Sequence, residues 1–390
     1  MSCTPDARCG TPALCGQCRL IAKDPRFAAA FAQSAAPKPA GRVPLKLACF
    51  HLGPKVDPGC CCTDRHCLKG RGVVRLYDQC QTCPGHAPAV KPTPPPLVAP
   101  LRLVPVGPDR LAARPDGYSF NAGLIRHRGR LLMAYRDGWA GSNVHVAELT
   151  EDYTVVRSTK INLSHPRAAG GREDPRLFTL GGRLHVAFIG VERAGQRIRT
   201  SQLYARLGDD LDVGEVFYPE LAGRQEPMEK NWSMFDHNGE LLAVYTTGPR
   251  HVVVRIDGDR AERVADTPVT LPWAGGVLRG GAPPVRVGDL YYHWFHGRTG
   301  ADRKPHYNVG LSVFEAKPPF RVVAQSPRPM LWGSAADNAA ETKPNYCVVA
   351  FPCGAILEAG VWRVSMGWND RGVRVAEWDA ATVDRAVGLG

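Results

Sequence analysis

The residues of this sequence best suited to catalysis form the run Gly171-Arg172-Glu173-Asp174-Pro175-Arg176. Short runs of strand-forming residues on either side of Gly181-Gly182 predict a strand, a tight turn and a second strand. Because side chains alternate along a strand, we expect Asp174 and Arg176 to share one face and Glu173 to lie on the other. A carboxylate beside a guanidinium at a strand end serves either as an acid in a polar site or as a structural ion pair. Both interpretations stay open at this point.

The same strand–turn–strand layout occurs five times along the chain, and each unit is followed by a further alternating run. The turn glycines are Gly129, Gly182, Gly239, Gly288 and Gly360, which are 53, 57, 49 and 72 residues apart. Six residues after them stand large apolar side chains, namely Tyr135, Phe188, Tyr245, Trp294 and Met366. Four short strands per unit, at a period of about 55 residues, are typical of a β-propeller blade. We therefore predict an all-β fold, a five-bladed β-propeller over residues 113–385.

The chain before the propeller has a different composition. Eleven of the thirteen cysteines lie between Cys3 and Cys83, and residues 1–100 contain thirteen Lys and Arg against five Asp and Glu. We interpret residues 1–86 as a small, loop-rich, Cys-rich basic module. Residues 87–112 are rich in proline, which is typical of an extended, semi-rigid linker.

Such a density of cysteines in a reducing compartment favours metal binding over disulfides. The tightest local set with suitable spacing consists of Cys62, Cys67, Cys80 and Cys83. Four thiolates can hold a structural zinc ion tetrahedrally, and we take this set as the candidate zinc site. The alternative is a thiol-rich or disulfide-stapled module without metal.

Hydropathy and charge bear on location and partners. The sequence contains no stretch of eighteen apolar residues, and its first residues lack the apolar core of a secretory signal. We expect no membrane span and, by default, a cytoplasmic protein. The basic residues 1–100 favour polyanions. They lack interleaved aromatic residues, so nucleic acid is not the favoured partner. The oligomeric state stays open.

The run from Gly171 to Arg176 resembles the G-x-E-D-P-R signature of glycoside hydrolase family 130, the β-mannoside phosphorylases and hydrolases. Similar segments occur in the family's order, namely Phe120-Asn121, Tyr135-Arg136, Glu229-Lys230-Asn231-Trp232, Gly281-Ala282-Pro283-Pro284, His296-Gly297, Tyr307-Asn308-Val309-Gly310, Phe351-Pro352-Cys353-Gly354 and Gly367-Trp368-Asn369-Asp370. The resemblance extends over residues 115–380 and does not include residues 1–100. It implies the same five-bladed propeller fold.

The resemblance also implies a reaction and its residues. The enzyme would cleave β-mannosides or related oligosaccharides with inversion, and Asp174 would be the general acid, acting through a sugar hydroxyl. Inorganic phosphate would be the co-substrate, and no cofactor is implied for catalysis. The residues implied to bind the substrate are Asn121, Arg136, Arg176, Asn231 and Tyr307. Those implied to bind phosphate are Lys230, His296 and Arg193.

Several alternatives remain at this stage. In a hydrolase, water would replace phosphate, and the candidate bases are Glu226, Glu229 and Glu341. A transferase would move mannose from an activated donor. A protein of another class, a non-catalytic propeller that binds a glycan or a protein, would need no acid facing cations. Asp137 and Asp370 lie near glycines, and we expect them to shape turns rather than to act in catalysis.

Overall fold

A computed structural model describes residues 96–106, 111, 118–138, 141–195, 197–222, 229–300, 305–340 and 347–390. The chain divides into a unit that ends at Lys91 and one that begins at Pro92, and every described residue belongs to the second unit. The predicted cysteine-rich module lies outside the described residues, as do its candidate zinc ligands Cys62, Cys67, Cys80 and Cys83. Within the described ranges, no helix is long and apolar enough to cross a membrane.

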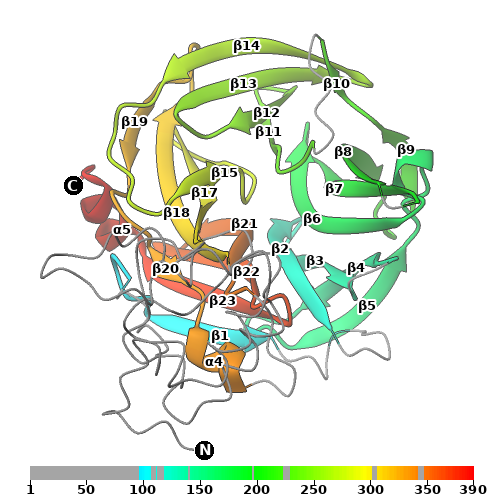
Figure 1. Cartoon of the computed structure of the whole chain (residues 1–390), viewed down its shortest axis with the longest axis horizontal. Helices are drawn as coiled ribbons and strands as arrows, with labels where there is room; N and C mark the ends of the chain where they lie inside the picture. The colour runs from blue at the N-terminus through cyan, green and yellow to red at the C-terminus, as the bar shows by residue number, and fades with distance from the viewer. Residues whose placement is uncertain are drawn as a thin grey trace, which may run out of the picture. The chain divides into compact units, whose positions relative to one another are not determined.

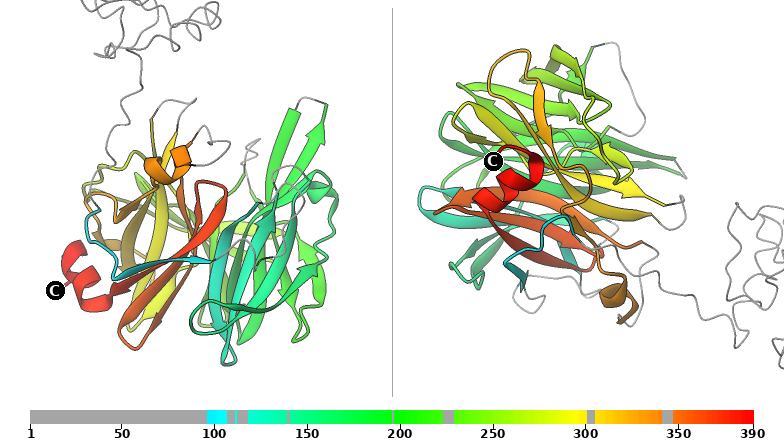
Figure 2. Two further views of the ribbon diagram at one scale, coloured as in Figure 1. Left: turned by 90° about the horizontal axis from the view of Figure 1, so that it is seen from below. Right: turned by 90° about the vertical axis from the view of Figure 1, so that its left-hand side faces the viewer.

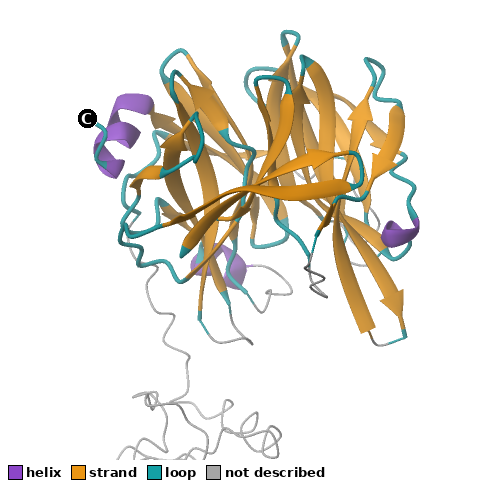
Figure 3. Ribbon diagram, turned by 90° about the horizontal axis from the view of Figure 1, so that it is seen from above, coloured by secondary structure: helices purple, strands orange, loops and turns teal. Residues whose placement is uncertain are grey.

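The described residues form five antiparallel sheets that radiate from a common axis (Figure 1). This arrangement confirms the predicted five-bladed β-propeller. Strands make up most of the described chain, and the short helices lie at its periphery (Figure 3).

The blades follow one another along the chain. Blade 1 contains β2 (Ser119–His127), β3 (Arg130–Asp137), β4 (Asn143–Leu149) and β5 (Val155–Ile161). After the short 3-10 helix η1 (Pro166–Ala168), blade 2 contains β6 (Gly171–Leu180), β7 (Arg183–Ala194), β8 (Arg197–Leu207) and β9 (Val213–Phe217). Blade 3 contains β11 (Ser233–His237), β12 (Glu240–Thr246), β13 (Arg250–Asp257) and β14 (Arg260–Pro268), with β10 (Glu220–Leu221) parallel to β14.

In blade 4 the innermost strand is interrupted. Its strands are β15 (Val277–Arg279), β16 (Val285–Val287), β17 (Leu290–Thr299), β18 (His306–Glu315), β19 (Val322–Gln325) and β20 (Leu331–Trp332). Both β15 and β16 pair with β17. The chain between them contains Pro283 and Pro284, which have no N–H to donate to a ladder.

Blade 5 joins the two ends of the propeller chain. Its strands are β21 (Ala350–Glu358), β22 (Val361–Trp368), β23 (Gly372–Asp379) and β1 (Arg102–Val106). Strand β1 pairs with β23 and lies inside the range 87–112 that the sequence predicted to be linker. The linker prediction is wrong for these five residues. The prolines around them suggested an extended linker, whereas Arg102–Val106 form a strand that completes the sheet of blade 5. Helices α4 (Ala335–Ala340) and α5 (Ala380–Val387) lie beside this blade (Figure 2).

The apolar cores lie between neighbouring blades. For example, Trp294 of blade 4 stacks on Trp378 of blade 5, with ring centroids 5.0 Å apart. The five apolar residues that follow the turn glycines are all buried. Because neighbouring blades cover both faces of each sheet, its central strands contain nearly continuous apolar runs. Among the buried polar residues of the inner strands, Asn121 and Asp174 lie where β2 and β6 begin.

Candidate active site

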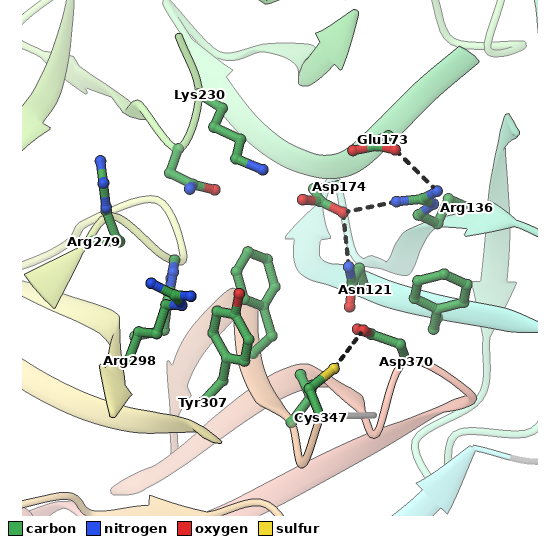
Figure 4. A pocket seen from close by; sticks show the side chains of 15 residues that line it. Asn121, Arg136, Glu173, Asp174, Lys230, Arg279, Arg298, Tyr307, Cys347 and Asp370 are labelled. Carbon is green, nitrogen blue, oxygen red and sulfur yellow. Dashed lines mark hydrogen bonds and ion pairs between the residues drawn. The ribbon is translucent and has the colours of Figure 1, made fainter. Parts of the chain in front are cut away.

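A pocket of ≈ 520 Å³ opens on the axis at the end where the inner strands begin. All five blades contribute to its wall (Figure 4). The lining residues are Phe120, Asn121, Arg136, Glu173, Asp174, Lys230, Asn231, Arg279, His296, Arg298, Tyr307, Cys347, Val349, Phe351 and Asp370. The pocket thus contains most of the site residues predicted from the sequence.

The inner strands of blades 1 and 2 each contain a β-bulge where they enter the pocket. Two residues of β2, and likewise two of β6, oppose a single residue of the neighbouring strand. The first residue of each bulge is in the left-handed region, Asn121 with φ 53° and Asp174 with φ 50°. A bulge redirects side chains, so Glu173 lines the pocket together with Asp174. The prediction from strict alternation, that Glu173 lies on the other face, is wrong for this reason.

Asp174 is held by side chains from another blade. Asn121 Nδ2 donates a hydrogen bond to Asp174 Oδ1 at 2.7 Å, and Arg136 Nη1 lies 3.4 Å from the same oxygen. Burial by itself raises the pKa of this carboxyl group, but Arg136, Arg176, the hydrogen bond from Asn121 and Lys230 together hold its pKa below the usual value. Asp174 is therefore a carboxylate at neutral pH in the free protein.

Arg136 joins both carboxylates of the bulge. Its Nη2 lies 3.3 Å from Glu173 Oε1, and its guanidinium carbon lies 4.8 Å from the centroid of the Phe120 ring. The Arg136 side chain is buried, whereas that of Glu173 is 23% exposed. Arg136 lines the pocket where the sequence placed it, but its nearest charged partners are protein carboxylates.

Arg176 lies behind the pocket wall. It is fully buried, donates from Nη2 to Asn231 Oδ1 at 3.0 Å, and its guanidinium carbon is 5.6 Å from the centre of the Phe351 ring. A residue in this position does not reach a ligand in the pocket. The prediction that Arg176 contacts substrate is therefore replaced by an indirect role, since it orients Asn231 and lowers the pKa of Asp174.

The other side of the pocket is cationic. Figure 4 shows Arg279 and Arg298 across the pocket from Asp174 and Arg136, with Lys230 extending between the two groups. The sequence had singled out Lys230 but neither arginine. The pocket therefore has Glu173 and Asp174 on one side and two arginines on the other, with the Lys230 ammonium between them.

Blade 4 supplies four of the lining residues through two ladders. Arg279 of β15 is paired with His296 of β17, and Arg298 of β17 is paired with Tyr307 of β18. Directly opposed residues of neighbouring strands project from the same face of a sheet. Alternation along β17 places His296 and Arg298 on one face, so the sequence contained a signal for Arg298 once His296 had been chosen. Arg279 had no comparable signal, because its strand has only three residues.

His296 lines the pocket as a neutral side chain. Burial, followed by the effect of Arg176, lowers its pKa to about 3. Its Nδ1 lies 2.8 Å from the carbonyl oxygen of Gly280, which makes Nδ1 the donor and leaves Nε2 as an acceptor. This state suits a hydroxyl group better than an anion. The predicted phosphate contact of His296 thus lacks the positive charge that the prediction assumed.

Asp370 lies in the turn between β22 and β23 with φ 50°, as expected for a residue that shapes a turn. Its side chain also reaches the pocket, where Cys347 Sγ lies 3.6 Å from Asp370 Oδ2. The sequence interpretation did not predict this second feature. Across the ranges that the structure describes, no group of three or more His, Cys, Asp or Glu residues is arranged to hold a metal ion.

Other predicted residues lie away from the pocket. Arg193 is exposed near the end of β7, where β7 and β8 extend beyond the neighbouring blades (Figure 2). Glu229 does not line the pocket, because its carboxylate accepts hydrogen bonds from Trp232 Nε1 and Tyr245 Oη, both at 3.2 Å. The remaining candidate bases, Glu226 and Glu341, lie outside the described residues.

Comparisons with known proteins found solved structures that share this fold. No protein-family model matches the sequence, and no curated protein matches it. Solved structures, however, share the architecture. One belongs to work on the GH130 family of mannoside phosphorylases, which contains glycoside hydrolases that target β-1,2 mannosidic linkages in Candida mannan. It has 14% identity and a TM-score of 0.53, over 68% of this chain and 85% of that one.

Two further structures are similar to the same extent. The β-1,2-mannobiose phosphorylase from Listeria innocua, in complex with β-1,2-mannobiose, has 15% identity and a TM-score of 0.51 over 75% of this chain and 96% of that one. A glycosyl hydrolase from Bacteroides ovatus has 15% identity and a TM-score of 0.51 over 68% of this chain and 85% of that one. At these identities the similarity establishes the shared fold.

Proposed function

We propose that this protein is a glycoside phosphorylase that cleaves β-mannosides with inversion, using Asp174 as the proton donor and inorganic phosphate as the nucleophile. The observation that carries this proposal is a single axial pocket with Asp174 on one side, Arg279 and Arg298 on the other, and Lys230 between them. The structurally similar mannoside phosphorylases and hydrolases provide the sugar class.

Cleavage of a glycosidic bond with inversion requires an acid near the leaving oxygen and a nucleophile on the opposite face of the sugar ring. Asp174 serves as the acid and passes its proton through a sugar hydroxyl. Phosphate is an anion, and cations must hold it against the repulsion of nearby carboxylates. Arg279 and Arg298 supply these charges across the pocket from Asp174, and Lys230 adds a third between the two sides.

The polar groups between the two sides contact the sugar. Arg176 donates to the oxygen of the Asn231 amide, so the amide nitrogen is the atom that donates to a sugar hydroxyl. His296 accepts a hydrogen bond from a sugar hydroxyl at Nε2, because its Nδ1 donates to the carbonyl oxygen of Gly280. The Tyr307 hydroxyl is a further contact, and Asn121 positions Asp174. Arg193, exposed on β7, has no part in this scheme.

Hydrolysis is the second candidate, and a specific observation favours it. Besides Asp174, the pocket is lined by two more carboxylates, Glu173 and Asp370, either of which can accept a proton from water. No feature of the pocket favours mannosyl transfer or simple glycan binding in the same way. The experiment described next also distinguishes these two functions.

The test is incubation of the purified protein with β-1,2-mannobiose, with and without inorganic phosphate. Phosphorylase activity predicts mannose 1-phosphate that forms only when phosphate is present. Free mannose formed equally in both reactions would mean hydrolysis, and mannobiose bound without turnover would mean a binding protein. A panel of other β-mannosyl disaccharides separates a wrong linkage from a wrong reaction.

The acid is tested by Asp174→Asn, which keeps the shape of the side chain but removes its proton. We expect kcat to fall by about 10²-fold or more, the usual contribution of general acid catalysis. The matched control is Asp209→Asn, which removes an exposed carboxylate paired with Arg128 on the surface. If Asp174→Asn retains full activity while folded, Asp174 is not the acid.

A further inference from the structure

The state of Asp174 in the free pocket conflicts with its proposed task. Its pKa lies below the usual value, since the effects of Arg136, Arg176, Asn121 and Lys230 outweigh that of burial. At neutral pH the free pocket therefore contains a carboxylate, whereas bond cleavage needs a carboxylic acid at this position. Some event in the reaction must place a proton on it.

We propose that binding of the anionic co-substrate causes this protonation: an anion held by Lys230, Arg279 and Arg298 makes Asp174 take up a proton from solvent. The inference rests on the proposed function, because it concerns the acid and the anion of that reaction. It adds a coupling between protonation of Asp174 and binding of the anion, so that Asp174 is a carboxylic acid only when the nucleophile is bound.

The balance of charge in the pocket supports this coupling. The cations that line it are Arg136, Lys230, Arg279 and Arg298. The lining carboxylates are Glu173, Asp174 and Asp370. With the buried Arg176 behind the wall, five positive charges face three negative ones, and a bound dianion cancels the excess of two. The field that keeps Asp174 ionised is then lost, so the burial of its carboxyl group favours the neutral form.

Neither the histidine nor the cysteine near Asp174 changes its charge at neutral pH, so neither takes the place of Asp174 in the coupling. Lys230 is close enough to lower the pKa of Asp174 directly, so an anion that pairs with Lys230 removes part of the field that keeps the carboxylate ionised. His296 also senses both Asp174 and Arg279, but its pKa of about 3 keeps it neutral. Burial raises the pKa of the Cys353 thiol, which is likewise neutral.

Burial decides which carboxylate takes up the proton. The side chain of Asp174 is 10% exposed, whereas that of Glu173 is 23% exposed. Solvent screens the charge of Glu173 more effectively, and desolvation favours the neutral form of Asp174 more strongly. Asp370 lies on a separate turn of blade 5. Asp174 is therefore the group whose ionisation responds most to an anion in the pocket.

The proton balance closes over one turnover. Asp174 takes a proton from solvent when hydrogen phosphate binds, and gives it through a sugar hydroxyl to the leaving oxygen as the glycosidic C–O bond breaks. A phosphate oxygen forms the new bond to the anomeric carbon. The sugar phosphate still carries the phosphate proton, and it loses that proton to solvent on release. Without an anion, Asp174 stays ionised and attack by water lacks an acid.

The test measures proton uptake when sulfate binds, because sulfate stays a dianion above pH 4 and brings no proton. Calorimetric titrations in two buffers with different enthalpies of ionisation, between pH 4.5 and 6, give the number of protons bound. We expect uptake of a fraction of a proton to one proton per sulfate. The Kd for sulfate should decrease as the pH decreases, by at most about tenfold per pH unit, which is the limit for one linked proton.

Three variants identify the group. Asp174→Asn should abolish the uptake, make the Kd independent of pH, and bind sulfate more tightly than the wild type at pH 7.5. Glu173→Gln, which removes the neighbouring carboxylate, should keep the uptake. Arg193→Gln removes an exposed arginine outside the pocket and should match the wild type. Circular dichroism checks that each variant is folded.

Each other result overturns the inference. Sulfate that binds without proton uptake, uptake that persists in Asp174→Asn, or no sulfate binding up to a concentration of phosphate that supports turnover would each contradict it. The proposed function fails independently, when β-mannosides are not turned over although sulfate binding takes up a proton at Asp174. Phosphorolysis without proton uptake would leave the function standing and remove only the coupling.

Discussion

The position of the Asn121 side chain depends on Gly367, which packs against it. Asn121 occupies the left-handed region and donates to Asp174 at 2.7 Å. A Cβ atom added at Gly367 would overlap Asn121 Oδ1. The glycine at the end of β22 is therefore what leaves room for the amide that holds the candidate acid. Packing at one residue of blade 5 thus sets the geometry of a carboxylate in blade 2.

Gly367→Ala tests this contact. We expect it to displace the Asn121 side chain from Asp174, to reduce kcat, and to lower the free energy of unfolding by about 1–3 kcal/mol, as is usual for overpacking. Gly372→Ala is the matched control, because the nearest atom to an added Cβ there lies 3.9 Å away. Chemical denaturation and initial rates check both effects. Equal behaviour of the two variants would refute the steric argument.

We expect the substitution of Gln for Arg to have different effects on phosphate binding at Arg279 and at Arg193. Arg279 lines the pocket, whereas Arg193 is exposed on β7 outside it. Loss of a charged hydrogen bond to a phosphate costs about 1.5–3 kcal/mol. We therefore expect Arg279→Gln to raise the KM for phosphate by about 10- to 100-fold, and Arg193→Gln to leave it unchanged. The reverse order would restore the role predicted for Arg193 from the sequence.

At the scale of the elements, the middle strand β13 contains a buried histidine with an unusual environment. His251 is fully buried, and within the described residues neither of its ring nitrogens has a hydrogen-bond partner. Its ring lies 4.7 Å from that of Phe314 on β18. Burial lowers the pKa of His251 to about 4, so β13 packs against blade 4 only with a neutral imidazole.

This strand should therefore lose stability in acid. Between pH 6.5 and 4 the unfolded chain binds a proton at His251 and the folded chain does not, so stability falls as the pH falls. At pH 5 the loss is about 2 kcal/mol from this residue. We expect His251→Leu to reduce the decrease in the free energy of unfolding between pH 7 and pH 5. An unchanged pH dependence would show that the imidazole is protonated in the folded state.

At the scale of the whole molecule, the propeller is closed by strands from both ends of its chain. Strand β1 pairs with β23 over Arg102–Val106, and Val106 is buried against blade 1 in the core that it shares with blade 5. Closure by β1 covers the edge of β23, which would otherwise present unpaired backbone groups. We therefore expect β1 to contribute to the closure of the ring.

Truncation tests the closure. Removing residues 1–91 leaves β1 in place and should change the thermal unfolding of the propeller little. Removing residues 1–106 deletes β1 with its buried valine and half-buried neighbours. At about 1.5–3 kcal/mol for each buried aliphatic side chain, we expect a loss of about 3 kcal/mol or more. Calorimetry compares the two forms, and equal melting temperatures would show that β1 is dispensable.

Local patterns in the sequence were sufficient to predict the number of blades. A turn glycine is followed six residues later by a large apolar side chain such as Tyr135, Phe188 or Trp294, and each of these three is buried in the structure. The fivefold recurrence of this unit predicted five blades. Asp174 and Lys230 were predicted as site residues from the resemblance of their neighbours to a family motif, and both line the pocket.

The composition of the pocket was decided by tertiary structure. The bulge that turns Glu173 inward, the burial of Arg176 behind the wall, and the arrival of Arg279 from a three-residue strand depend on register and on close approach at the axis. Asn121 and Arg136 of blade 1 are 53 and 38 positions away from Asp174, and no local pattern in the sequence shows that they meet it. The chain thus determined by itself how many sheets form. Closure of the ring decided which charges face Asp174, because electrostatics depends on distance in space rather than along the sequence.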